Sequence, residues 1–184
     1  MEAFWISAVV VGLAEFGDKT QLAALVLAAR YREPVPIILG LAAATLANHA
    51  LAGLIGAGIA AALGPARLRL VLGVSFLAIA AWTLLPERPR DAPTRSPRLG
   101  VWGTSALTFF LLEMGDKTQI ATVALAARYQ SLAPVIAGTT VGMLIADVPA
   151  VFLGRIAARW LPLRLLRALA AGILAALGAL ALLA

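Results

Sequence analysis

Long apolar runs separated by short polar stretches dominate this 184-residue chain. Six runs can be drawn, over residues 4–29, 34–61, 70–85, 101–127, 132–154 and 165–183. Each approaches the roughly 20 residues that a helix needs to cross a bilayer. The runs are rich in Ala and Leu and lack the short alternating segments of a β-barrel. The pattern therefore predicts an all-α membrane protein with six transmembrane helices.

Two polar hexapeptides interrupt the first and the fourth of these runs. They read EFGDKT from Glu15 and EMGDKT from Glu113, and a glutamine follows each. Over the 17 pairs from Glu15/Glu113 to Tyr31/Tyr129, 12 are identical at a constant offset of 98. A charged side chain at the centre of a membrane helix costs about 2.5–3.5 kcal/mol on insertion scales. A chain that carries such groups twice, in register, is predicted to use them in its function.

The offset of 98 continues beyond the motifs, since Pro36 matches Pro134 and Gly40 matches Gly138. We therefore predict a first three-helix repeat over residues 1–85 and a second over residues 101–184. The linker between them, residues 86–100, contains four prolines and four arginines and is expected to be extended and solvated. Because three is odd, the second repeat enters the membrane from the opposite side, so the two repeats are inverted.

The arginines predict the orientation of the chain. Ten lie in or beside the loops that share the side of the linker: Arg30, Arg32, Arg88, Arg90, Arg95, Arg98, Arg155, Arg159, Arg164 and Arg167. The opposite side has three, which are Arg67, Arg69 and Arg128. Since positive loops stay in the cytoplasm, the linker is predicted to be cytoplasmic and both termini periplasmic.

The composition agrees with a membrane protein and excludes several other classes. Hydrophobic residues make up 62% and charged residues 13%, against about 25% charged residues in soluble domains. The net charge of +6 is explained by arginines facing anionic lipid. No basic stretch is interleaved with aromatic residues, so the lipid bilayer is expected as a partner and nucleic acid is not. The absence of cysteine excludes disulfides and thiolate chemistry.

The side chains of each motif share one face if the helix is continuous. Asp18 is three residues and Lys19 four residues after Glu15, and Gln21 continues the stripe. Thr20 points away on an ideal helix unless the glycine before Asp18 loosens it. The predicted metal ligands are Glu15, Asp18, Gln21, Glu113, Asp116 and Gln119, with Thr20 and Thr118 as additional candidates. If the repeats are inverted, the two motifs meet near the middle of the membrane.

Charge counting narrows the ion that such a site would carry. Four carboxylates and the two lysines, Lys19 and Lys117, leave a net charge of −2. One divalent cation or two protons would neutralise it. Carboxylate and amide oxygens suit Ca²⁺, Mg²⁺ and Mn²⁺, whereas zinc or copper would favour cysteine or several histidines. The sulfur of Met114, beside the second motif, is a hint toward Mn²⁺.

His49 and Asp147 are two further polar residues in apolar runs, and they occupy the same repeat position. One interpretation is a proton relay, or supporting contacts to Lys19 and Lys117, which we expect to balance charge and couple protons. The other interpretation is a satisfied packing contact. Pro149 removes a backbone donor and is expected to free a carbonyl near Ile145.

The doubled E-x-G-D-[KR]-[ST] motif resembles the Golgi calcium/manganese transporter family and its bacterial manganese-exporter relatives. The resemblance covers essentially the whole chain. It implies a cation/proton antiporter that moves Mn²⁺ or Ca²⁺ out of the cytosol, with Glu15, Asp18, Glu113 and Asp116 as ligands. The second motif often has arginine where this chain has Lys117.

Mn²⁺ or Ca²⁺ is then the transported substrate, no permanently bound cofactor is expected, and the protein is not an enzyme. The long acidic central loop of eukaryotic relatives is missing between the repeats, which favours a bacterial inner (plasma) membrane. A Ca²⁺/H⁺ antiporter with the same site is the closest alternative. An intramembrane enzyme and a membrane assembly subunit are alternatives of another class, although intramembrane aspartyl proteases use a G-x-G-D element that this chain lacks. Selectivity, stoichiometry and oligomeric state stay open.

Overall fold

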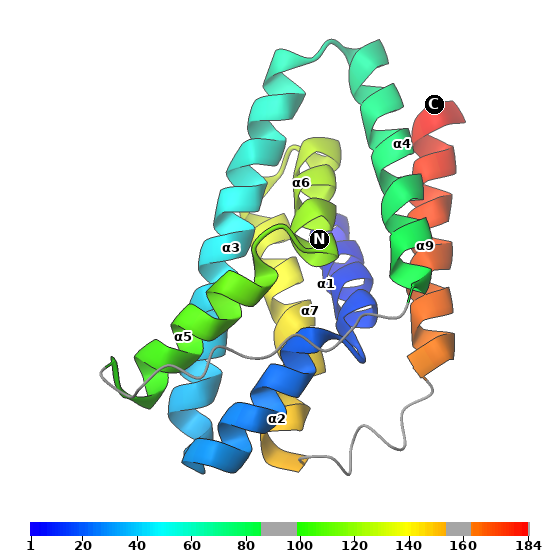
Figure 1. The fold of residues 1–184 in the computed structure, drawn as a ribbon. Helices are drawn as coiled ribbons and strands as arrows, with labels where there is room; N and C mark the ends of the chain where they lie inside the picture. Colours follow the sequence, from blue (N-terminus) through cyan, green and yellow to red (C-terminus); the bar gives the residue numbers. More distant parts are fainter. Residues whose placement is uncertain (86–98, 154–162, 184) are drawn as a thin grey trace.

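The computed structural model describes residues 1–85, 99–153 and 163–183, which form eight α-helices and no strand (Figure 1). The helices are α1 (Glu2–Glu15), α2 (Lys19–Tyr31), α3 (Pro34–Ala62), α4 (Pro65–Leu84), α5 (Gly100–Glu113), α6 (Lys117–Tyr129), α7 (Leu132–Leu153) and α9 (Leu163–Leu183). The predicted all-α class is confirmed. Most of the predicted linker, together with Arg155 and Arg159, lies outside the described residues.

Four of these helices are long and apolar enough to cross a membrane. They are α3, α4, α7 over Leu132–Phe152, and α9 over Arg164–Leu183. α4 begins at Pro65, five residues before the apolar run predicted from residue 70, because proline is well suited to a first helical turn. α7 continues through Pro149 to Leu153. The proline therefore does not divide this helix.

The prediction of a continuous helix over residues 4–29, and of another over 101–127, is wrong. The first run consists of α1 and α2, and the second of α5 and α6, with a break inside each motif. Gly17 has φ +78° and Gly115 has φ +76°, a left-handed conformation that side chains with a Cβ rarely adopt. One such residue is enough to end a right-handed helix. Each motif therefore lies at a joint between two half-length helices.

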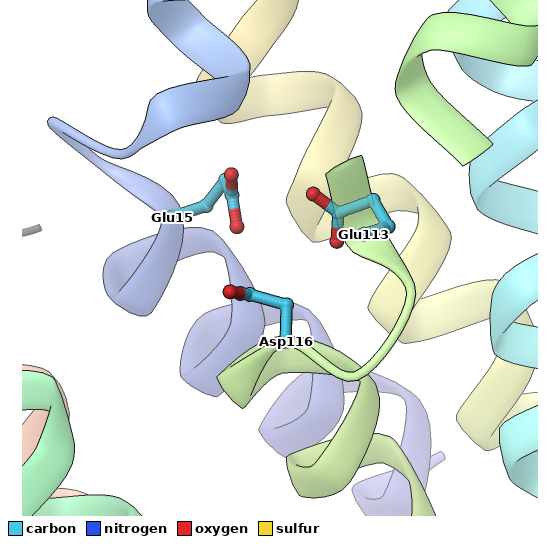
Figure 2. Close-up of side chains that lie close together, drawn as sticks. All are labelled: Glu15, Glu113 and Asp116. Carbon is cyan, nitrogen blue, oxygen red and sulfur yellow. The ribbon is translucent and has the colours of Figure 1, made fainter. Parts of the chain in front are cut away.

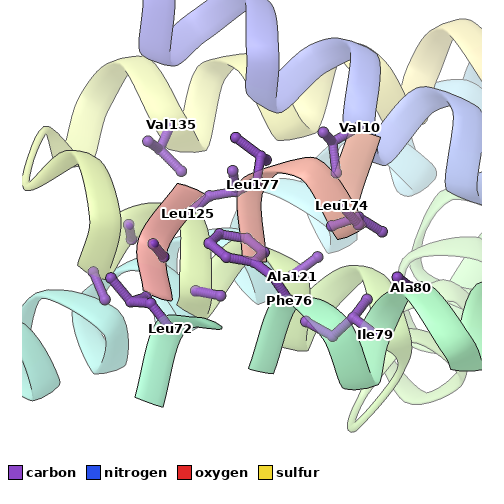
Figure 3. Close-up of a cluster of buried hydrophobic side chains, with 14 of the residues drawn as sticks. Val10, Leu72, Phe76, Ile79, Ala80, Ala121, Leu125, Val135, Leu174 and Leu177 are labelled. Atoms are coloured by element: carbon purple, nitrogen blue, oxygen red, sulfur yellow. The ribbon is translucent and has the colours of Figure 1, made fainter. Parts of the chain in front are cut away.

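Helix packing builds a core around these joints. α1 packs mainly on α7, α4 on α9, and α3 on α5, α6 and α7. In Figure 1, α4 and α9 run side by side along one flank of the molecule, with α3 on the other. Figure 3 shows how Phe76 of α4 lies among side chains of α6, α9 and α1, including Leu125 and Leu174. Phe76 is completely buried, as expected for the centre of an apolar core.

Several contacts occur twice, with the roles of the two halves of the chain exchanged. A Cβ added to Gly40 of α3 would lie 2.7 Å from the carbonyl oxygen of Trp102. A Cβ added to Gly138 of α7 would collide with the carbonyl of Phe4, the residue equivalent to Trp102 at the offset of 98. Glycine at both positions thus lets α3 approach α5, and α7 approach α1, at backbone distance.

Candidate cation site

The first motif builds a compact joint between α1 and α2. The carboxylate of Asp18 caps α2 and accepts a hydrogen bond of 2.6 Å from the N–H of Lys19. The N–H of Asp18 donates to the last carbonyl of α1, that of Glu15, at 3.0 Å. The N–H of Gly17 donates to Oε1 of Gln21 at 2.9 Å. Backbone groups that the break releases are therefore satisfied within the motif.

The second motif repeats this joint between α5 and α6. Asp116 caps α6, with the N–H of Thr118 3.5 Å from its carboxylate, and its own N–H donates to the carbonyl of Glu113 at 3.0 Å. The N–H of Gly115 donates to Oε1 of Gln119 at 2.7 Å. Both joints bring a helix N-terminus, with its partial positive charge, and a helix C-terminus, with its partial negative charge, to the same place. Half-helix ends of this kind form the ion sites of many transporters.

Two buried ion pairs connect the motifs to each other. Nζ of Lys117 lies 2.5 Å from Oδ2 of Asp18, and Nζ of Lys19 pairs with Oδ1 of Asp116. All four side chains are at least 94% buried. Each lysine thus pairs with the aspartate of the other motif. A continuous helix would instead have placed it beside the glutamate of its own motif. The two motifs meet, as the sequence predicted.

Each glutamate is held by the threonine of its own motif. The hydroxyl of Thr118 donates to Oε2 of Glu113 at 2.9 Å, and the hydroxyl of Thr20 donates to Oε1 of Glu15. On an ideal helix Thr20 would point away, and the break at the glycine turns it back. The remaining oxygens, Oε2 of Glu15 and Oε1 of Glu113, have no hydrogen-bond partner within the described residues. Both carboxylates are completely buried, so each keeps one acceptor available for another ligand.

Three carboxylates from the two motifs converge on one small space. Among the residues that the structure describes, single oxygens of Glu15, Glu113 and Asp116 lie within 4.8 Å of one another. Figure 2 shows the carboxyl groups of Glu15 and Glu113 facing each other above that of Asp116. Like charges at this separation repel strongly in a low dielectric. The arrangement suits a hard cation bound by carboxylate oxygens.

The two glutamines, predicted as ligands, make other contacts. Their amide oxygens accept from the motif glycines, as described above. Nε2 of Gln21 donates to the carbonyl of Ala146 at 2.8 Å, and Nε2 of Gln119 donates to Oδ1 of Asn48 at 3.3 Å. Asn48 in turn donates to the carbonyl of Phe110 at 3.0 Å. The sequence signal for Asn48 is its polar amide in an apolar run, one residue before His49, and this signal alone does not indicate a site residue.

His49 and Asp147 lie at equivalent places on α3 and α7. Both are completely buried. Neither ring nitrogen of His49, and neither carboxylate oxygen of Asp147, has a hydrogen-bond partner within the part of the chain described. Asp18 and Thr20 are among the polar neighbours of Asp147. Both interpretations of these residues, a proton relay and a packing contact, therefore stay open.

Two residues near the joints differ from what the sequence suggested. A guanidinium nitrogen of Arg167, on α9, donates to the carbonyl of Gly17 at 3.0 Å. The sequence position of this arginine predicts only a place beside a cytoplasmic loop, because nothing in the local pattern relates it to a residue 150 positions away. The side chain of Met114 is 53% exposed. Its sulfur therefore gives no argument for Mn²⁺ at the buried carboxylates.

Comparison with known proteins gives two matches. The sequence pattern of a family described as "Divalent cation/proton antiporter GDT1" matches residues 3–91 and 101–184. A curated protein of Vibrio cholerae serotype O1, provisionally named a manganese exporter, is 49% identical over 174 residues, which are 94% of this chain and 86% of the relative. No solved structure matches the chain.

Proposed function

Because the chain belongs to the divalent cation/proton antiporter family GDT1, we propose that it exports Mn²⁺ from the cytoplasm in exchange for protons. The observation that carries this proposal is the cluster of Glu15, Glu113 and Asp116, whose oxygens lie within 4.8 Å of one another. Two of these carboxylates each have an oxygen without a partner within the described residues. The choice of Mn²⁺ is supported by the name of the Vibrio cholerae relative, which describes a manganese exporter.

We assign the ion to Glu15, Glu113, Asp116 and Asp18. The first three have oxygens within 4.8 Å of one another, and Asp18 is included because it is the counterpart of Asp116 in the first motif. The lysines then hold Asp18 and Asp116 when no cation is bound, and the cation competes with them for the same oxygens. The glutamines and threonines act as supports, because their hydrogen bonds fix the joints and the glutamates.

Charge explains why the two cargoes exchange. The four carboxylates and two lysines of the motifs carry −2 when all are ionised. Either one divalent cation or two protons restores neutrality. The empty site cannot be buried cheaply, since each uncompensated charge in a low dielectric costs several kcal/mol. The protein is therefore expected to switch between its inward-open and outward-open states only when the site holds one divalent cation or two protons.

Several contacts occur twice, with the roles of the two halves of the chain exchanged, and they support two inverted three-helix repeats. The six spans are then α1–α2, α3, α4, α5–α6, α7 and α9, and each joint divides one span. Gly40 with Trp102 and Gly138 with Phe4 form such an exchanged pair. Lys19–Asp116 and Lys117–Asp18 form another. The arginine asymmetry supports a cytoplasmic linker and periplasmic termini. The bacterial inner membrane is supported by the Vibrio cholerae relative and by the missing acidic central loop.

The helix pair α4–α9 departs from this exchange. α4 packs against α6 and α9 against α1, but the equivalent pairs, α9 with α2 and α4 with α5, are not among the well-packed pairs of the described chain. We infer that in this conformation the path to the cation site is closed at the end where α1 and α6 pack against α4 and α9. In the other state of the transporter, α9 would pack against α2 and α4 against α5 instead. A disulfide engineered between α4 and α6 should stop transport, and unchanged transport would contradict this inference.

His49 and Asp147 stay predicted participants in the proton step. Their support is complete burial without a hydrogen-bond partner in the described residues. Asp147→Asn should leave Mn²⁺ binding measurable but reduce the coupled proton movement. Normal proton movement in this variant would remove Asp147 from the proposal.

A vesicle assay tests the proposed function and its closest alternative, a Ca²⁺/H⁺ antiporter. Purified protein is reconstituted, and uptake of Mn²⁺, Ca²⁺ and Mg²⁺ is compared with that of Glu15→Gln and Glu113→Gln. The proposal expects Mn²⁺ uptake in wild type and none in either variant. Preference for Ca²⁺ would favour the alternative. Uptake of neither Mn²⁺ nor Ca²⁺ would contradict the proposed function.

A further inference from the structure

We propose that a second site, remote from the carboxylates, binds the phosphate headgroup of an anionic phospholipid. A cavity of about 430 Å³ lies between the ends of α3, α6 and α9 and the start of α4. Its volume is within the range of about 300–1,000 Å³ that is usual for small-molecule sites. Arg69, Arg128, Tyr129 and Gln130 give it a polar side, and apolar side chains such as Leu68 form the rest of its wall.

The two arginines are available to an anion. Within the described chain, neither Arg69 nor Arg128 forms an ion pair with a carboxylate. Arg128 lies over the ring of Tyr129, with its guanidinium carbon 5.7 Å from the ring centroid. The hydroxyl of Tyr129 donates to Oε1 of Glu2 at 3.5 Å, which places one carboxylate near this end but not in the wall of the cavity. Two guanidinium groups therefore exceed the negative charge that the described residues bring to the cavity.

Comparison of the repeats shows that the fold does not use Arg69 as it uses its equivalent. At the offset of 98, Arg69 corresponds to Arg167. Arg167 donates to the carbonyl of Gly17, whereas Arg69 lines the cavity. Arg69 is thus left without the structural contact of its counterpart, which is consistent with a role in binding.

The position of the cavity favours a lipid as the source of the phosphate. α3 ends at Ala62, α4 begins at Pro65, and both are long and apolar enough to span the membrane. The cavity therefore lies at headgroup level, beside the acyl chains. Guanidinium forks match phosphate oxygens in geometry and charge, so this basic pocket suits an anionic headgroup of the leaflet on the side opposite the linker. Apolar walls suit the glycerol backbone and the first carbons of the chains.

Native mass spectrometry of the purified protein with phosphatidylglycerol tests this site. Wild type should bind the lipid, and Arg69→Gln and Arg128→Gln should each bind it about tenfold more weakly or worse, because each loses a charge-assisted hydrogen bond. Arg67→Gln is the matched control: Arg67 is exposed, lies two residues from Arg69 and does not line the cavity. Its binding should equal that of wild type.

Further arms separate a bound lipid from a soluble anion and from a general loss of positive charge. Phosphatidylcholine should bind more weakly than phosphatidylglycerol, and glycerol phosphate without acyl chains should not compete at equal concentration. Ala60→Phe, which fills the cavity and keeps both arginines, should also weaken lipid binding. Equal binding in Arg69→Gln, Arg128→Gln and wild type would overturn the site, as would an equal loss in Arg67→Gln. Competition by glycerol phosphate would replace the lipid with a soluble anion. None of these outcomes depends on whether the protein transports Mn²⁺.

Discussion

Lys117→Gln removes one of the two ammonium groups that hold the motifs together in the structure. Lys117 lies 2.5 Å from Asp18, and both side chains are at least 96% buried. Breaking a buried ion pair by removing one partner typically costs about 3–5 kcal/mol, since it leaves a buried charge uncompensated. The net charge of the motifs becomes about −3, by subtraction of one lysine from the −2 of the native set.

This cost falls mainly on the cation-free protein. A bound divalent cation replaces part of the lost charge, so the cation-bound form should be destabilised less. A difference of about 1.4 kcal/mol is a tenfold change in an equilibrium constant, so even half of the cost corresponds to roughly tenfold tighter Mn²⁺ binding. Tighter binding of the ion, with a residual charge of about −1, should slow its release and therefore turnover.

Thermal unfolding with and without Mn²⁺, together with vesicle uptake, measures both effects. Lys117→Gln should melt lower than wild type without Mn²⁺, gain more from added Mn²⁺, and transport more slowly. Lys117→Arg is the matched control because it keeps the charge, and it should remain close to wild type in Mn²⁺ affinity. Weaker Mn²⁺ binding in Lys117→Gln, or faster turnover than wild type, would refute the charge argument.

Three further predictions concern ligands, backbone and topology. Asp18→Asn and Asp116→Asn should each abolish transport without unfolding the protein, because an amide keeps the shape but not the charge that a hard cation needs; near-normal cellular Mn²⁺ tolerance in either variant would contradict this. Gly115→Ala, at φ +76°, should lower the free energy of unfolding by about 1–2 kcal/mol. Gly58→Ala, in open space on α3, should raise it by about 0.5–1 kcal/mol, and equal effects in a denaturation assay would argue against strain. A cysteine at Ser96, which lies outside the described residues, should resist an impermeant thiol reagent added to intact cells, and ready labelling would reverse the proposed orientation.

The duplication was visible in the sequence because both copies keep the same polar residues at a constant offset. That regularity correctly predicted that the motifs meet, since the structure pairs Lys19 with Asp116 and Lys117 with Asp18. The choice of partners was not predictable. It depends on how the two halves cross, and a spacing of four residues suggested a contact within one helix instead.

The helix breaks were not predictable for a related reason. An isolated glycine is tolerated inside helices, so Gly17 alone could indicate either a weak point or a joint. The joint becomes stable through contacts that are remote in sequence. Gln21 reaches the carbonyl of Ala146, and Arg167 reaches the carbonyl of Gly17. A local pattern contains no information on such contacts, although it did mark Gly17 as a residue that could turn Thr20.

The central claim is electroneutral exchange of one divalent cation for two protons at the paired motifs. Its most direct measurement is the lumenal pH of vesicles that contain the reconstituted protein, recorded while Mn²⁺ is driven inward by its gradient. Electroneutral exchange predicts that Mn²⁺ entry alkalinises the lumen by two protons for each ion, and that an imposed membrane potential does not change the rate. Mn²⁺ entry without a pH change, or a rate that follows the potential, would contradict it.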